Sequence, residues 1–267
     1  MRTDAKANRI VLAIAGFDPS GSAGLIADIR TLVAFSCRPA AAITSLTFQN
    51  SEKLFGTIHQ SAESLRAQIL PLVEEFHIAA VKIGMLPTRE LVSEVVRLLG
   101  ETGMPAPIVD PVLRSSSGYE LMEAEAREVW LSELMPLARL ITPNIPEAET
   151  LTGMTIKNES DMHAAARALR ERGAGAVLIK GGHLEQRSEV GGQKSEKPRP
   201  NRQAIDLLDD DGIVTVFLGE WIDAPPVRGT GCMLSSAIAA GIEQGKNLHD
   251  SVNAAKRFVA DAIRAAT

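Results

Sequence analysis

The sequence predicts an α/β protein in which a mostly parallel central sheet is covered by helices on both faces. Short apolar runs alternate with longer segments of helical periodicity, which is the pattern of strands and helices taking turns around a parallel sheet. Hydrophobic residues make up 45% of the 267 residues and aromatic residues only 4%, so the core is expected to be continuous and aliphatic. A turn signal late in the chain adds an antiparallel edge.

The apolar runs give the expected strands, and the periodic segments give the expected helices. Buried strands are predicted at residues 9–15, 40–46, 79–83, 107–109, 140–142 and 176–180. Amphipathic helices are predicted at residues 61–76, 89–99, 123–134 and 161–172, and two closing helices at 232–243 and 248–266. Further helices are expected to begin after the small-residue loop at 15–24 and at Asn144.

The chain is expected to fold as a single domain over residues 1–267. Asp-Asp-Asp-Gly at 209–212 separates apolar runs at 204–208 and 213–218, which predicts a hairpin that finishes the sheet. The polar segment at 185–202 is rich in Gly, Ser, Lys and Pro, and we expect it to be a flexible, exposed loop. In an open sheet of this class, ligands bind outside the carboxyl ends of the strands.

Charge and cysteine usage exclude several classes of partner. The formal net charge is −5 with both signs interspersed, so no basic face is expected for nucleic acid or for a membrane surface. Cys37 and Cys232 lie far apart in a chain too large to need a disulfide framework, which favours a reducing compartment and hence the cytoplasm. The first apolar run stops at Gly16, too short to span a bilayer.

The clearest local signal for chemistry is the segment Arg-Gly-Thr-Gly-Cys at 228–232, which leads directly into a helical run. Glycines let the backbone approach a ligand closely, and a helix start offers unpaired N–H groups, so the segment suits an anion such as a phosphoryl group. A cysteine in that first turn is expected to have a lowered pKa, which makes Cys232 a candidate base or nucleophile. The alternative is an ordinary glycine turn followed by a core cysteine.

The small-residue loop at 15–24 suits a pocket for an uncharged part of a ligand, because it lacks the lysine of a Walker motif. Asp28 falls on the apolar stripe of the following helix, where a buried carboxylate must meet either a ligand donor or internal backbone groups. Gln49 follows the second expected strand and carries an amide that suits the edge of a heterocycle, although such residues are also ordinary in loops.

Three further strand ends carry charged or amide side chains. Asn144 and Glu147 are expected one turn apart, where they could support hydrated Mg²⁺ or simply start a helix. Lys180 precedes two glycines at a strand end, from which it can reach a phosphate, and Asp110 ends another strand. The histidines and cysteines show no metal-ligand spacing, and no serine stands in a Gly-x-Ser-x-Gly elbow, so a zinc site and a serine hydrolase are disfavoured.

The ordered combination of AGFDPSGSAG, KIGML, VDPV, TPNIPEAE, KGGH and RGTGC resembles the hydroxymethylpyrimidine/phosphomethylpyrimidine kinases of thiamine biosynthesis, from about residue 10 to about residue 260. The resemblance implies a ribokinase-like three-layer α/β/α fold and ATP-dependent phosphorylation of 4-amino-5-hydroxymethyl-2-methylpyrimidine, of its monophosphate, or of both. It implies ATP and Mg²⁺ as cofactors and a homodimer as the assembly. Arg228 departs from the family pattern, because a histidine is common at that position.

The resemblance also implies a role for each matching position. Cys232 would activate the substrate hydroxyl beside the catalytic glycines Gly229 and Gly231, and Asn144 and Glu147 would support Mg²⁺. Lys180, Thr230 and Asp110 would contact the nucleotide. The pyrimidine pocket would be formed by Gly16, Asp28, Gln49, Met85 and Val112.

Two other functions remain open at this point. A pyridoxal or pyridoxine kinase shares the fold, ATP and a hydroxymethyl acceptor, but the small-residue loop at 15–24 and Gln49 favour the pyrimidine. A non-catalytic pyrimidine-binding sensor is a different class, and it has no use for an anion site beside metal support.

Overall fold

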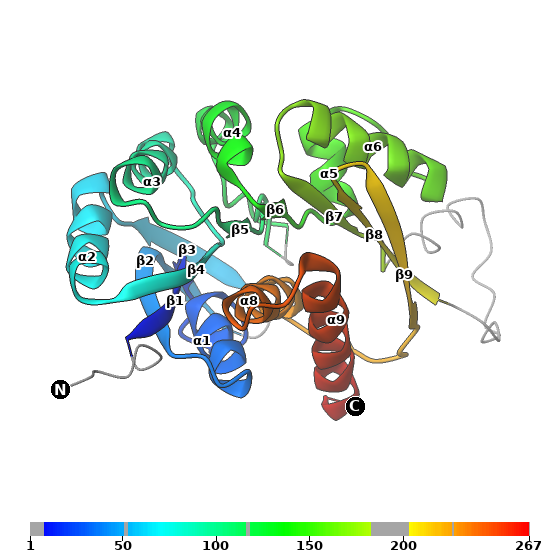
Figure 1. Cartoon of the computed structure of the whole chain (residues 1–267), viewed down its shortest axis with the longest axis horizontal. Helices are drawn as coiled ribbons and strands as arrows, with labels where there is room; N and C mark the ends of the chain where they lie inside the picture. The colour runs from blue at the N-terminus through cyan, green and yellow to red at the C-terminus, as the bar shows by residue number, and fades with distance from the viewer. Residues whose placement is uncertain (1–7, 51–52, 116–117, 183–202, 226, 267) are drawn as a thin grey trace.

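The computed structural model describes residues 8–50, 53–115, 118–182, 203–225 and 227–266. Within these residues the chain forms a nine-stranded sheet of order β3-β2-β1-β4-β5-β6-β7-β8-β9, with helices on both faces (Figure 1). The prediction of a three-layer α/β/α fold with a mostly parallel sheet is confirmed. The loop expected at 185–202 lies outside the described residues.

Six strands of the sheet run parallel and bring their carboxyl ends to one edge, while β3, β8 and β9 add antiparallel pairings. Strand β3, which pairs with β2, was not predicted from the sequence. The strands are β1 (Arg9–Phe17), β2 (Pro39–Gln49), β3 (Leu54–His59), β4 (His77–Ile83), β5 (Ile108–Val109), β6 (Leu140–Ile141), β7 (Ala176–Lys180), β8 (Gln203–Asp210) and β9 (Ile213–Glu220).

The hairpin of β8 and β9 closes one side of the sheet as predicted. Asp210 pairs with Ile213, so the loop has only the two residues Asp211 and Gly212. Their φ values are 55° and 80°, and positive φ at both positions is the signature of the turn whose twist matches a hairpin. The Asp-Gly dipeptide therefore fixes the register of the last two strands.

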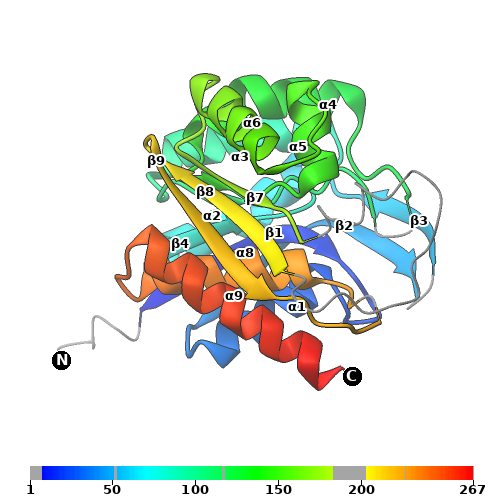
Figure 2. The same cartoon turned by 90° about the vertical axis from the view of Figure 1, so that its right-hand side faces the viewer.

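The helices form one layer on each side of the sheet (Figure 2). One layer contains α2 (Ala62–Glu75), α3 (Arg89–Thr102), α4 (Ala124–Val129), α5 (Ile145–Thr152) and α6 (Glu159–Glu171). The other contains α1 (Gly24–Ala34), α8 (Thr230–Glu243) and α9 (Leu248–Ala265). The helix predicted at 123–134 is α4 extended by a π-helical turn, η1 (Trp130–Leu134), and a short 3₁₀ turn, η2 (Met135–Leu137).

Strand β1 is hydrophobic from Ile10 to Ala15, with no alternation of apolar and polar residues, because both of its faces are buried. Ile10, Leu12 and Ile14 pack into the core shared with α2 and α3, whereas Val11 packs into the core shared with α8 and α9. A central parallel strand is buried on both faces, so both sets of side chains must be hydrophobic. The sheet is thereby a rigid platform for the loops at its carboxyl edge.

Candidate active site

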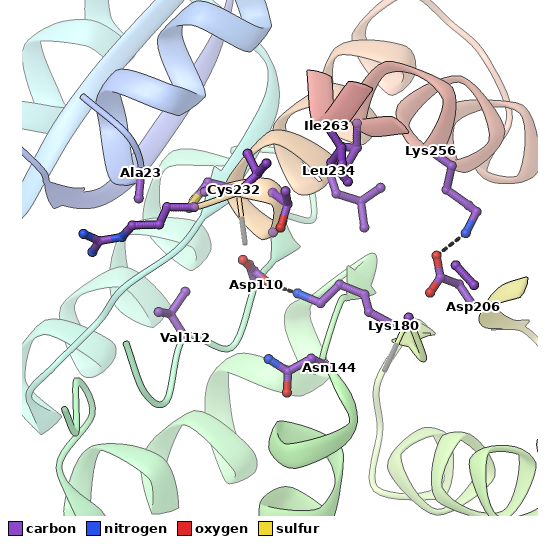
Figure 3. A pocket seen from close by; sticks show the side chains of 18 of the residues that line it. Ala23, Asp110, Val112, Asn144, Lys180, Asp206, Cys232, Leu234, Lys256 and Ile263 are labelled. Carbon is purple, nitrogen blue, oxygen red and sulfur yellow. Dashed lines mark hydrogen bonds and ion pairs between the residues drawn. The ribbon is translucent and has the colours of Figure 1, made fainter. Parts of the chain in front are cut away.

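A cavity of about 1320 Å³ opens at the carboxyl ends of the parallel strands and the start of α8 (Figure 3). All but one of the site residues expected from the sequence line it. They are Gly16, Gln49, Met85, Asp110, Val112, Asn144, Glu147, Lys180, Gly229, Thr230, Gly231 and Cys232. The fold therefore gathers residues from six strand ends and one helix start into one place, and Asp28 is the exception.

The glycine segment forms the first turn of α8. Gly229 is the N-cap residue with φ 77°, and a Cβ there would lie 2.1 Å from the Ser22 carbonyl oxygen, so only glycine is accommodated. No side chain caps the first N–H groups of α8, which leaves them available to a ligand at the positive end of the helix dipole. The segment has the geometry of an anion-binding site.

Asp110 and Lys180 form an ion pair directly opposite this glycine turn. Lys180 Nζ lies 2.8 Å from Asp110 Oδ1, which also accepts a hydrogen bond from the Thr142 hydroxyl at 2.9 Å. A Cβ on Gly231 would lie 3.1 Å from Asp110 Oδ2 and 3.3 Å from Lys180 Nζ. Burial disfavours the charge on Asp110, but Lys180, Lys82 and the Thr142 hydroxyl together outweigh it and hold the pKa of that carboxyl below its usual range. The cavity therefore keeps a fixed cation within reach of the anion site.

Cys232 lies in the first turn of α8 on the cavity wall. Burial raises the pKa of its thiol to about 11, and Asp28 and Asp110 add to this effect, while Lys82 opposes it. The expectation that the helix start lowers this pKa is therefore wrong, because desolvation outweighs the opposing effects of Lys82 and of the Gly24 backbone hydrogen bond. At neutral pH Cys232 is a protonated thiol.

Asp28 does not line the cavity. Its carboxylate is completely buried behind the cavity wall, where it accepts hydrogen bonds from Lys82 Nζ and from the Ser236 hydroxyl, both at 2.8 Å. The predicted need of the Asp28 carboxylate for a partner is thus met twice inside the protein. Direct contact between Asp28 and a substrate stays a prediction. The pair holds Lys82, which was not predicted as a site residue from the sequence, in the cavity wall near Cys232.

Asn144 and Glu147 form a reciprocal capping box at the start of α5. The Glu147 carboxylate accepts the Asn144 N–H at 2.8 Å, and the Asn144 side-chain oxygen accepts the Glu147 N–H at 2.9 Å. Burial raises the pKa of Glu147 to about 7, although Lys180 opposes this. Within the described ranges no group of three His, Cys, Asp or Glu residues could hold a metal ion. The Asn144 amide and the Glu147 carboxylate therefore fit a role in holding the water molecules around Mg²⁺, and they are not a complete set of direct metal ligands.

The other end of the cavity is apolar. Met85, Leu54 and Leu121 form a buried cluster against which Val112 packs. A Cβ on Gly16 would lie 2.9 Å from the Met85 sulfur, so the glycine leaves room for that side chain. Leu54 and Leu121 were missed by sequence reasoning, because the first belongs to the unpredicted strand β3 and the second to an irregular segment. This end suits a flat, methyl-bearing ring.

The match to a known family covers nearly the whole chain. The family model described as "Phosphomethylpyrimidine kinase" matches residues 18–267. The hydroxymethylpyrimidine/phosphomethylpyrimidine kinase of Aquifex aeolicus is 38% identical over 255 residues, which cover 96% of this chain and 94% of that protein.

Solved structures give the same fold, and one of them gives the same family. The phosphomethylpyrimidine kinase of Clostridium difficile has a TM-score of 0.79 at 36% identity, covering 95% of this chain and 98% of that one. The pyridoxal kinase of Staphylococcus aureus in complex with AMP-PCP and pyridoxal has a TM-score of 0.81 at 26% identity, covering 96% and 88%. The ribokinase-like fold is therefore confirmed, and the chain belongs to the phosphomethylpyrimidine kinase family, the ATP-dependent phosphotransferases of thiamine biosynthesis.

Proposed function

We propose that this chain transfers the γ-phosphoryl group of ATP to 4-amino-5-hydroxymethyl-2-methylpyrimidine and then to the resulting monophosphate. The observation that carries the proposal is the position of the glycine turn of α8 against the Asp110–Lys180 pair, beside an apolar pocket. Phosphoryl transfer needs positioning and charge stabilisation more than covalent chemistry. The cavity offers both, at the point where a ring and a triphosphate would meet.

Each group at the cavity wall has a proposed task. The free N–H groups from Gly229 to Cys232 bind the phosphoryl oxygens during transfer, and Lys180 neutralises charge on them with the ammonium hydrogens that Asp110 leaves free. Thr230 contacts the same phosphates at the helix start. Cys232 takes the proton of the substrate hydroxyl once the thiol has ionised.

The magnesium proposal rests on the chemistry of the capping box. Asn144 and Glu147 lie across the cavity from the glycine turn, and the second carboxylate oxygen of Glu147 can accept a hydrogen bond from a metal-bound water. When bound, Mg²⁺ supplies charge neutralisation for the phosphates, which contribute most of its ligands together with water.

The heterocycle is recognised at the apolar end of the cavity. Met85 and Val112 cover the faces of the ring, Gly16 leaves space beside it, and Gln49 reads its polar edge. Pyridoxal is the second candidate substrate, because a solved structure of this fold contains it together with AMP-PCP.

A substrate panel tests the proposal. Purified protein with ATP·Mg²⁺ is offered hydroxymethylpyrimidine, its monophosphate, pyridoxal or ribose, and ADP release is followed for each. We expect kcat/KM to be largest for the two pyrimidines and negligible for ribose. A larger kcat/KM for pyridoxal than for the pyrimidines would make pyridoxal the assigned substrate. If no ADP is released with any of the four compounds, the proposed reaction is refuted.

The assembly proposed is a homodimer in the cytoplasm. Leu46, Phe48 and Ile58 share one face of β2 and β3 and are 37%, 47% and 54% exposed, which is an apolar strip suited to a second copy. Both cysteines are unpaired thiols, which fits a reducing compartment. Among the described residues no helix is long and apolar enough to cross a bilayer. Light scattering should give twice the chain mass, and Phe48→Asp should give the monomer.

A further inference from the structure

Arg228 joins two parts of the site that are 179 residues apart in sequence. Its guanidinium donates one hydrogen bond to the side-chain oxygen of Gln49 at 2.8 Å and another to the backbone oxygen of Asn50. Gln49 ends β2 at the apolar end of the cavity, whereas Arg228 immediately precedes the glycine turn of α8. One side chain therefore connects the strand end that faces the ring to the turn that faces the phosphates.

The partners of Arg228 distinguish it from the lysines of the cavity wall. Lys82, Lys180 and Lys256 each pair with a buried carboxylate, of Asp28, Asp110 and Asp206 respectively. Among the described residues, the partners of Arg228 are two neutral oxygens. The position of Arg228 is therefore explained by its two hydrogen bonds and not by neutralisation of a carboxylate.

The contact fixes which way the Gln49 amide faces. A guanidinium has five donors and no acceptor, so the amide group it meets must be the oxygen and not the NH₂. The amide nitrogen of Gln49 has no hydrogen-bond partner among the described residues, and Gln49 lines the cavity. Its two N–H donors are thus left for a ligand, together with the second lone pair of the oxygen.

We propose that Arg228 is a positioning residue that holds the Gln49 amide in one orientation, with its N–H donors presented to an acceptor nitrogen of the substrate ring. Because Arg228 is covalently joined to the first residue of the glycine turn, this orientation exists only when the turn is in place beside the phosphate site. Ring recognition and phosphoryl transfer are then linked through one side chain. The identity of the ring rests on the proposed function, but the positioning role does not.

A double-mutant cycle tests this role. Arg228→Met, Gln49→Leu and the double variant are compared with the wild type by KM for the pyrimidine, KM for ATP, kcat and Tm. Arg228→Met should raise the pyrimidine KM about tenfold, because the Gln49 amide can then rotate and no longer presents its N–H donors to the ring in a fixed orientation. The KM for ATP should stay within about twofold of the wild-type value. Adding Arg228→Met to Gln49→Leu should leave the pyrimidine KM unchanged, because the group it positions is already absent.

Two further variants separate positioning from other effects. Arg228→Lys keeps one donor and should restore part of the pyrimidine KM. Arg89→Met removes an exposed arginine at the start of α3 that does not line the cavity, and it should match the wild type in every readout.

The proposal is overturned if Arg228→Met raises the pyrimidine KM equally in the Gln49→Leu background. It is also overturned if only the KM for the monophosphate rises, because Arg228 would then contact the substrate phosphate directly. A fall in Tm and kcat with unchanged KM values would indicate a purely structural contact. If the wild type phosphorylates pyridoxal and not the pyrimidine, the proposed function fails, and the same cycle run with pyridoxal still decides the role of Arg228.

Discussion

The pH dependence of turnover tests the role of Cys232 most sharply. Its thiol pKa of about 11 means that about one thiol in 3,000 is ionised at pH 7.5. If the thiolate accepts the proton of the substrate hydroxyl, the rate of transfer follows the ionised fraction. kcat/KM for the pyrimidine should therefore rise about tenfold for each pH unit from about pH 7 to about pH 9.5.

Two substitutions at this position fix the interpretation. Cys232→Ala removes the base and keeps the backbone N–H, so kcat/KM should fall about 10²–10⁴-fold and lose its rise with pH. Cys232→Asp places a carboxylate at the helix start that is ionised throughout this range, so its profile should be flat and its rate at pH 7.5 partly restored. The assay is steady-state ADP release with ATP saturating and the pyrimidine concentration varied. A wild-type rate for Cys232→Ala, or a flat wild-type profile, would refute the base assignment.

Three other substitutions test the cavity wall and its support. Gly231→Ala puts a methyl group 3.1 Å from the Asp110 carboxylate, so kcat should drop about 10²-fold while Tm stays within a few degrees, and wild-type turnover would contradict the close approach of turn and ion pair. Lys180→Met should raise the KM for ATP at least tenfold and leave pyrimidine binding intact by calorimetry. Asp28→Asn leaves Lys82 buried without its counter-ion, so urea unfolding should show a loss of about 3 kcal/mol; a loss below about 1 kcal/mol would mean that the pair is not an ion pair.

The sequence was sufficient for those parts of the fold that local patterns determine. Buried parallel strands are continuous apolar runs, so β1 and β7 were found within a few residues, and the Asp-Gly turn gave the hairpin of β8 and β9. Strand β3 was missed because Phe55 and Ile58 are exposed and its pattern does not alternate cleanly. The irregular turns after α4 were read as one helix, because Trp130 and Leu134 keep a helical spacing through the π-helical turn.

The site was predictable as a set of residues but not as a set of interactions. Strand topology alone sends Lys180 and Asp110 to one edge, which is why sequence reasoning could select them. The partner of Asp28 lies 54 residues away on β4, and that of Gln49 lies 179 residues away, so neither follows from spacing. The thiol pKa of Cys232 depends on how closely the folded chain surrounds it, which no local pattern reports.

The chemical identity of the products distinguishes phosphoryl transfer to the pyrimidine from hydrolysis of ATP. The protein is incubated with ATP·Mg²⁺ and hydroxymethylpyrimidine, and ³¹P NMR follows the phosphorus signals over time. We expect a phosphate monoester of the pyrimidine first and then its diphosphate, with ADP formed in step with each transfer. ADP that accumulates with inorganic phosphate, and without a phosphorylated pyrimidine, would contradict it.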